Sequence, residues 1–203
     1  GETTGLTGEV TLFALRTAAA DMTNWAQRGI FVRVAVNVSA LDLATPDFAD
    51  EVSRVLREFD LPASQLALEV TESALIRSPQ EAIATLTRLR GLGIRLSIDD
   101  YGTGQSTLSY LKNLPVHELK IDKSFVTTLA NSENDAIMVR STINMAHAPG
   151  LQVVAEGIED RTTLDALADM GCDYAQGYFI GKPVPSDEFP KIATDPRFMR
   201  DVA

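Results

Sequence analysis

Short apolar segments alternate with helical segments along the whole chain, and this alternation restricts the possible folds more than any other feature. Strands are predicted at residues 32–38, 66–70, 117–121, 152–155 and 174–180, with one more strand beginning at Arg95. Helical spacing of apolar residues or helix-start signals predict helices at 9–28, from 45, at 78–92, 106–114, 133–148 and 162–170. Strands separated by helices favour βαβ crossovers, so we expect an α/β fold with a parallel sheet.

Polar residues follow the predicted strands at the same end. They are Asn37, Glu69, Asp99, Asp100, Lys120, Glu156 and Gln176. In a parallel α/β barrel the active site is built at the carboxyl ends of the strands. Any one of these residues could be a helix cap or a solvated loop residue. A polar group at the same end of six strands indicates a functional site.

Asp99 and Asp100 are adjacent carboxylates that lead into a glycine-rich turn. Side chains alternate faces along a strand, so both can reach one site only where the strand ends and the backbone turns. Gly102 and Gly104 permit such a turn. Two neighbouring acids repel each other unless a positive charge lies between them, and a divalent metal ion would supply that charge. Ordinary turn and cap chemistry is the alternative explanation.

The candidate ligands are carboxylate and amide oxygens, which suit Mg²⁺ or Mn²⁺, or Ca²⁺. The only histidines, His117 and His147, do not follow a strand, so a zinc site is not expected. The adjacent aspartates suggest two ions, which together could promote phosphoryl displacement. Lys120 could bind a phosphate or orient a hydroxide, or it could form a structural ion pair with Asp122 or a neighbouring acid.

The composition sets further bounds. A formal net charge of −10 disfavours binding to nucleic acid duplexes or anionic membranes. The single cysteine, Cys172, fits a reducing compartment. No apolar run approaches the roughly 20 residues needed to span a bilayer, and no signal peptide opens the sequence. We therefore expect a soluble, cytoplasmic domain.

Six short motifs resemble the EAL-type phosphodiesterase family, which hydrolyses the bacterial messenger cyclic di-GMP to linear pGpG. They are Asn37-Val38-Ser39, Glu69-Val70-Thr71-Glu72, Asp99 to Gly104, Leu119-Lys120-Ile121-Asp122, Val154-Ala155-Glu156-Gly157 and Gln176-Gly177-Tyr178. The motifs follow the family's order across nearly the whole chain. The resemblance implies a modified (β/α)8 TIM-type barrel with two Mg²⁺ or Mn²⁺ ions at the strand ends.

The resemblance also implies a role for each matching residue. The implied metal ligands are Asn37, Glu69, Asp99, Asp100 and Glu156, with Asp99 bridging the two ions and Glu156 acting as a ligand or as a base. Lys120 would orient the hydroxide, and Glu72 would anchor the loop that carries Asp100. Gln176 and Asp122 would contact the substrate. Members of the family often form homodimers and often adjoin a cyclase-like GGDEF domain or a sensor domain.

Two departures from the family pattern affect this interpretation. The loop continues with Gln105-Ser106-Thr107 in place of an aromatic residue and two serines. The Glu-Ala-Leu signature strand, which carries a metal-ligating glutamate near a substrate-binding arginine, is absent. A (β/α)8 barrel takes roughly 250 residues, whereas this chain has 203 residues and six predicted strands. We therefore expect residues 1–203 to form a single domain whose first two strands are missing, with its open edges covered by upstream residues or a second chain.

Three functions remain open at this point. The first is a metal-dependent cyclic di-GMP phosphodiesterase, impaired if the missing strands are needed. The second is a catalytically silent module that binds cyclic di-GMP or a protein partner. The third is an unrelated barrel enzyme that uses Mg²⁺ to stabilise an enolate, which explains neither the glycine-rich loop nor the Lys120 motif.

Overall fold

Six parallel strands form one curved sheet in the computed structural model, which describes residues 4–77, 79–102, 114–129 and 132–195. The strands are hydrogen-bonded in the order in which they occur along the chain: β1 (Val34–Val38), β2 (Leu66–Thr71), β3 (Arg95–Tyr101), β4 (Glu118–Ile121), β5 (Gln152–Ala155) and β6 (Tyr174–Ala175). This order, with parallel pairing throughout, results when helices connect successive strands in a barrel.

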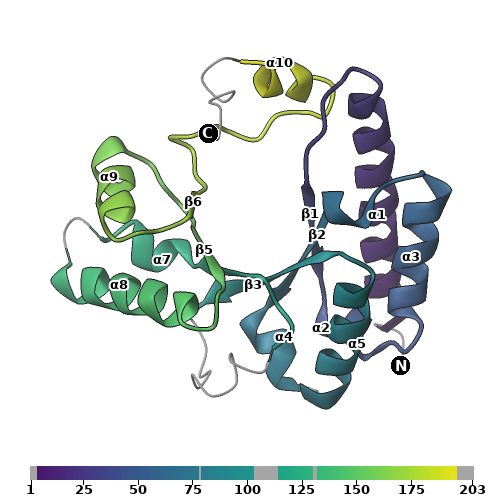
Figure 1. Ribbon diagram of the computed structural model, residues 1–203, viewed down its shortest axis with the longest axis horizontal. Coiled ribbons are helices and arrows are strands. Elements are labelled where there is room, and N and C mark those ends of the chain that lie inside the picture. Colours follow the sequence, from purple (N-terminus) through teal and green to yellow (C-terminus); the bar gives the residue numbers. More distant parts are fainter. Residues whose placement is uncertain (1–3, 78, 103–113, 130–131, 196–203) are drawn as a thin grey trace.

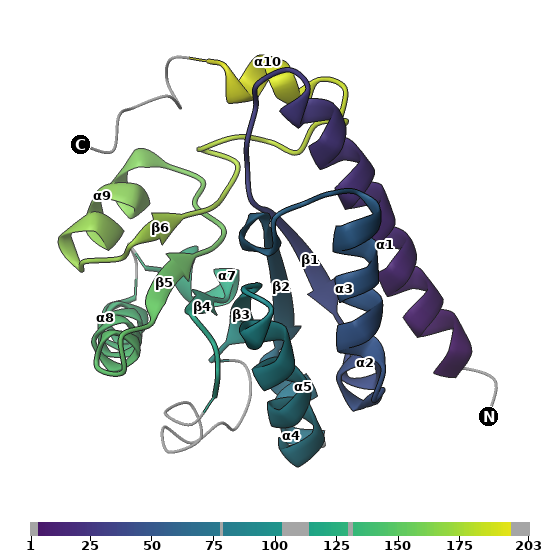
Figure 2. The same cartoon turned by 45° about the vertical axis from the view of Figure 1, so that its right-hand side comes forward.

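Most of the helices surround the convex face of the sheet, and the last one lies across its opening (Figure 1). They are α1 (Thr4–Ala26), α2 (Ala40–Ala44), α3 (Phe48–Glu58), α4 (Glu72–Arg77), α5 (Pro79–Gly91), α7 (Lys123–Val126), α8 (Glu133–His147), α9 (Arg161–Asp169) and α10 (Phe189–Ala193), with a 3-10 turn η1 (Ala63–Gln65). The second view shows the curved sheet enclosed on its outer side (Figure 2). The fold is therefore the expected modified (β/α)8 barrel, and the described residues supply six of its strands. None of the described helices is long and apolar enough to cross a membrane.

The pleat of the strands separates an apolar face from a polar face. Leu68, Leu96, Leu119 and Val153 are fully buried and belong to the core. Glu69, which follows Leu68 on β2, therefore points to the concave side of the sheet. The same alternation places Asp99 and Lys120 on the concave side, at the carboxyl ends of β3 and β4. The register of the ladder thus gathers the polar residues at one end of the barrel.

Side-chain caps explain where several helices begin. Ser39 and Asp42 form a capping box at the start of α2, and Asp42 also accepts a hydrogen bond of 2.8 Å from Thr11 of α1. Ser132 and Asp160 accept hydrogen bonds from backbone amides at the starts of α8 and α9. These caps fix the turns in which the chain leaves each strand and enters the next helix.

The last strand is shorter than the sequence predicts. We expected a strand over residues 174–180, but β6 ends at Ala175. The chain leaves the ladder because Gly177 packs directly on the backbone of Ile158, where a Cβ atom would lie 2.2 Å from the Ile158 carbonyl oxygen. The amide of Ile158 also donates to the carbonyl of Gln176. These contacts with Ile158 outweigh the strand propensity of the apolar residues that follow Gly177.

Other expected boundaries differ less. The first helix begins at Thr4 rather than at residue 9, and the first strand begins at Val34 rather than at residue 32. Helices α2, α4 and α7 were not predicted, because four to six residues are too few to show a helical period. The predicted helix at 106–114 lies outside the described residues, apart from Leu114.

The two ends of the sheet, β1 and β6, do not pair with each other, so the barrel wall is open. The segment after β6 crosses to the other side of this opening and docks on the carboxyl-terminal end of α1 (Figure 1). The indole of Trp25 donates to the carbonyl oxygen of Ser186 at 3.0 Å, and the hydroxyl of Ser186 donates to Asp21 at 2.7 Å. The rings of Trp25 and Phe189 lie 4.4 Å apart. A helix of five residues is not stable alone, so α10 depends on these contacts.

We predict that Trp25→Ala will detach this tail while leaving the sheet folded. The substitution removes a ring contact and a hydrogen bond, which together correspond to about 1–3 kcal/mol of unfolding free energy. Limited proteolysis should then cut within residues 182–195, and denaturant unfolding should report the lost stability. Trp25→Phe keeps an aromatic ring and should lose only the hydrogen bond, about 1 kcal/mol. If Trp25→Ala resisted proteolysis as well as the wild type does, Trp25 would not be what holds the tail on α1.

Candidate metal centre at the carboxyl end of the sheet

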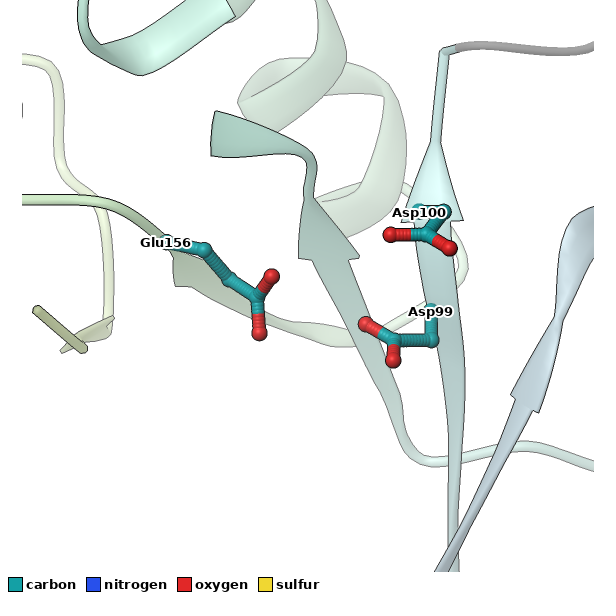
Figure 3. Close-up of side chains that lie close together, drawn as sticks. All are labelled: Asp99, Asp100 and Glu156. Atoms are coloured by element: carbon teal, nitrogen blue, oxygen red, sulfur yellow. The ribbon is translucent and has the colours of Figure 1, made fainter. Parts of the chain in front are cut away.

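Carboxylates from separate strands converge at the carboxyl end of the sheet. Oxygen atoms of Asp99, Asp100 and Glu156 all lie within 4.8 Å of one another. Figure 3 shows the two aspartates projecting from the end of β3 toward Glu156, which follows β5. Glu69 reaches the same place from β2, because its partners in the ladder are Asn37 on β1 and Ser97 on β3.

Lys120 lies at the centre of this group, on the strand between β3 and β5. Its ammonium nitrogen is 2.8 Å from Glu69 Oε2, 3.1 Å from Asp99 Oδ1 and 2.6 Å from Glu156 Oε1. The side chain is only 5% exposed. Burial alone would lower the pKa of Lys120, but the hydrogen bonds to Glu156 and Glu69 outweigh it and raise the pKa above its usual range. The lysine is therefore a fixed positive charge.

One ammonium does not neutralise the cluster, because it contacts three carboxylates and Asp100 adds a fourth nearby. Burial raises the pKa of Glu69, although the hydrogen bond from Lys120 opposes this shift, and the charges of Asp99 and Glu156 raise it further. Burial also raises the pKa of Asp100, and the neighbouring Asp99 and Asp122 add to that shift. Both shifts reflect excess negative charge in a partly desolvated site. A further cation would reduce this excess of negative charge.

The backbone at Asp100 allows both aspartates to face the site. Asp100 has φ 54°, in the left-handed region, and the register of β3 against β4 shifts between Ile98 and Tyr101. This is the irregularity of a β-bulge, which turns a side chain that would otherwise point outward. We expected the strand to end before the turn, but β3 continues through the bulge to Tyr101. The left-handed conformation costs an ordinary residue about 1–2 kcal/mol, and aspartate tolerates it better than most.

Glu72 holds the turn that follows. It is 3% exposed, and its Oε2 accepts a hydrogen bond of 3.1 Å from the backbone amide of Gly102. Gly102 has φ 102°, and a Cβ atom there would lie 2.9 Å from the ring of Phe125. Glycine is therefore required at this position for both conformation and space. Gly104, the second glycine of the predicted turn, lies outside the described residues.

The donors present fit a divalent metal ion with oxygen ligands. Among the described residues, Asp99 Oδ1 is a buried oxygen without a hydrogen-bond partner. Its 3.1 Å contact with the Lys120 ammonium is an ion pair that lacks hydrogen-bond geometry. A buried acceptor of this kind is costly unless a ligand satisfies it. His117 instead accepts from the amide of Leu96, and His147 contacts Asp173, so both histidines have other partners. The cluster is one of carboxylate oxygens, as the sequence predicts.

The remaining predicted site residues lie at the borders of the cluster. Asn37 is the ladder partner of Glu69, and Gln176 donates its backbone amide to Ala155, just before Glu156. Asp122 caps α7, accepts from the Ser124 amide at 3.0 Å, and contacts the Ser124 hydroxyl. Lys120 forms no ion pair with Asp122, because Lys120 points to the concave face while Asp122 begins a helix. It forms the alternative ion pairs with neighbouring acids instead.

Sequence reasoning missed a second polar layer deeper on the concave face. Arg95 pairs with Glu118 and Gln152, and Gln152 donates to the hydroxyl of Tyr174 at 3.0 Å. Ser97 lies above this layer, fully buried, and its hydroxyl has no hydrogen-bond partner among the described residues. The period-two alternation of Arg95, Ser97 and Asp99 was the signal that could have placed all three on one face.

We predict that Glu72→Ala will loosen the turn without unfolding the domain. The Gly102 amide would lose its buried acceptor, so its hydrogen exchange should become faster. Because the turn positions Asp100, affinity for Mn²⁺ should fall by roughly 10- to 100-fold, as for other groups that orient metal ligands. Amide exchange followed by mass spectrometry and calorimetric titration would measure the two effects.

Glu81→Ala is the matched control, because Glu81 is exposed in the first turn of α5. It should change neither the exchange rate nor the affinity. If Glu72→Ala exchanged at Gly102 as slowly as the control, Glu72 would not hold the turn.

The fold and this cluster define an α/β barrel with an acidic, oxygen-donor site at the carboxyl ends of its strands. Comparison with known proteins gives the family. The model of the EAL domain matches residues 1–183. The chain belongs to the EAL domain family.

Named relatives and solved structures agree with this assignment. A cyclic di-GMP phosphodiesterase of Pseudomonas aeruginosa is 39% identical over 90% of this chain and 31% of its own length. MucR of the same organism, a bifunctional diguanylate cyclase and cyclic di-GMP phosphodiesterase, is 38% identical over 92% of this chain and 27% of its own. The c-di-GMP complex of the PaMucR phosphodiesterase superposes with a TM-score of 0.87 at 38% identity, covering 93% of this chain and 76% of that one. The chain thus spans less than a third of the length of these two curated relatives.

Proposed function

We propose that this domain hydrolyses cyclic di-GMP to linear pGpG with the help of two divalent metal ions. The observation that carries the proposal is the convergence of Asp99, Asp100 and Glu156 within 4.8 Å, beside Glu69 and Lys120. Family membership and the names of the relatives support the same activity. An excess of carboxylates over cations is what a site for Mg²⁺ or Mn²⁺ requires.

The residues of the cluster divide between two ions in this proposal. Asn37, Glu69 and Asp99 would hold the first, and Asp100 would hold the second with Asp99 as the bridging ligand. Glu156 would serve as a ligand or as a base. When bound, such ions supply positive charge to the phosphate and lower the pKa of water.

The chain's own residues would organise the displacement. Glu156 would accept a proton from the water that attacks phosphorus, and Lys120 would hold that water in place. The bond from phosphorus to the 3′-oxygen of the neighbouring nucleotide then breaks, and the leaving oxygen takes up a proton. One water molecule is consumed, and the product has a free 5′-phosphate and a free 3′-hydroxyl.

Gln176 and Asp122 would contact the substrate in this proposal. Gln176 is exposed beside the end of β5, so its amide is accessible at the mouth of the site. Asp122 lies close enough to Asp100 to raise the pKa of that residue, and it therefore borders the cluster on the side of α7.

A catalytically silent module that binds cyclic di-GMP or a protein partner is the second candidate. The observation in its favour is the set of contacts at Lys120, which occupy Glu69, Asp99 and Glu156 and leave them engaged with an internal cation. An enolate-forming barrel enzyme has less support, because the family match and the named relatives concern phosphodiester chemistry.

We further propose homodimerisation and a neighbouring regulatory domain. Ile137 and Met138 on α8 are half exposed or more, and Met138 lines a small cavity with Tyr101 and Gly102 at the end of β3. Exposed apolar residues beside the site favour an interface there. The bifunctional MucR relative supports an adjoining cyclase-like or sensor domain.

Product analysis of the full-length protein tests the proposed activity. We expect cyclic di-GMP to be converted to pGpG in Mg²⁺ or Mn²⁺ and not after treatment with EDTA, because the carboxylates alone cannot stabilise charge on phosphate. Chromatography would quantify the product, and calorimetry would measure nucleotide binding in Ca²⁺. Binding without turnover in all three metals would favour the silent module. Neither binding nor turnover would reject the phosphodiesterase and the nucleotide-binding module, and would leave only a module that binds a protein partner.

We predict that Asp100→Asn will abolish most turnover while preserving the fold. Asparagine tolerates the left-handed backbone, so the bulge should remain, but it lacks the charge needed for the second ion. Turnover of cyclic di-GMP should fall by at least about 100-fold, with the melting temperature nearly unchanged. Asp169→Asn, at an exposed position on α9, is the control and should retain full turnover. Wild-type turnover in Asp100→Asn would end the two-ion proposal.

A further inference from the structure

Lys120 lies among the carboxylates that would hold a divalent ion. Its ammonium contacts Asp99 and Glu156, which are two of the three carboxylates of the acidic cluster. It also contacts Glu69. The lysine therefore engages one oxygen of each of three carboxylates that would hold a divalent ion.

An ammonium and a divalent ion cannot share these oxygens at full strength. The contacts of Lys120 measure 2.6–3.1 Å, and an Mg²⁺ ion approaches its oxygen ligands to about 2.0–2.1 Å. The ammonium would also reduce the negative charge that these carboxylates offer to an incoming ion, in a partly desolvated site where charges act strongly on one another. Entry of the ion must therefore weaken the contacts of the lysine.

The surroundings of Lys120 indicate that its charge stabilises the carboxylate cluster. Its side chain is 5% exposed, and those of Glu69, Asp99 and Glu156 are 13%, 14% and 17% exposed. Carboxylates this close to one another and this poorly hydrated repel unless a cation lies between them. The lysine supplies part of that positive charge through its three contacts.

We propose that Lys120 is an internal stand-in for the divalent ion, which must displace its ammonium from Asp99 and Glu156 in order to bind. The inference rests on the proposed function in taking the acidic cluster to be the metal site. It follows that the lysine weakens metal affinity and stabilises the metal-free fold. Binding of the ion would also release Glu156 from Lys120. Glu156 therefore becomes available as a ligand or base only when the metal is bound.

Lys120→Met tests this exchange, because methionine keeps most of the length of the side chain and removes the charge. Calorimetry with Mn²⁺ alone would measure affinity, and thermal unfolding in EDTA and in saturating Mn²⁺ would measure stability. Neither readout requires turnover. Lys191→Met is the matched control, because Lys191 is exposed on α10, far along the chain from the cluster.

Three results are expected of Lys120→Met. Its melting temperature in EDTA should fall by roughly 5 °C or more, because three carboxylates lose their cation. Its affinity for Mn²⁺ should rise at least about tenfold, because the ion no longer competes with the ammonium. Saturating Mn²⁺ should therefore raise its melting temperature more than that of the wild type. Lys191→Met should match the wild type in all three.

Other outcomes separate this inference from the proposed function. If the wild type binds Mn²⁺ and Lys120→Met binds it equally or more weakly, Lys120 only positions the ligands and the stand-in role is wrong. If neither protein binds Mn²⁺, the metal site and the stand-in role both fail. Should Lys120→Met not fold in EDTA, recovery of the fold in Mn²⁺ would support the exchange. If it folds in neither condition, Lys120→Gln replaces it with the same expectations.

A crystal structure of the Mn²⁺-loaded wild type decides the question without any substitution. The ammonium nitrogen of Lys120 should lie more than 4 Å from the oxygens of Asp99 and Glu156, beyond the range of an ion pair. An ion bound at the cluster with the present distances of 3.1 and 2.6 Å retained would overturn the proposal.

Discussion

The ion pairs between Lys120 and the carboxylates of Glu69, Asp99 and Glu156 are the interaction on which the rest of the site depends. The four residues come from four separate parts of the chain, and each lies at or near the end of a parallel strand. Parallel pairing in sequential order brings these ends together, since every crossover helix returns the chain to the same side of the sheet. The buried leucines on the opposite face hold the register, so the packing of the core and the geometry of the site have one origin.

A second constraint comes from the two adjacent aspartates in β3. Adjacent residues of a strand face opposite sides, yet Asp99 and Asp100 both face the cluster. The protein resolves this with a bulge, a left-handed conformation at Asp100 and a buried glutamate that holds the following amide. Strained backbone of this kind persists only where surrounding contacts impose it. Here Glu72 and the ring packed on Gly102 provide those contacts.

Much of the fold was predictable because strand and helix periods are local properties of the sequence. The parallel sheet and the end of it at which Glu69, Asp99 and Lys120 lie follow from the alternation of strands and helices along the chain. The predictions failed where contacts distant in sequence decide the outcome. Strand β6 stops early because Gly177 meets the backbone of Ile158, and the tail is placed by Trp25 on the first helix. Neither partner can be inferred from neighbouring residues.

The sequence by itself determined which chemical groups reach the carboxyl end of the sheet, since the polar residue that follows each apolar strand must lie there in a parallel fold. It also indicated a missing positive charge beside the paired aspartates. Only the tertiary structure decided that a lysine supplies part of this charge. The curvature of the sheet brings Lys120 within 3.1 Å of Asp99 from the neighbouring strand, although no basic residue lies beside the aspartates in sequence. Distances across strands depend on stagger and curvature, which the local pattern of residues does not encode.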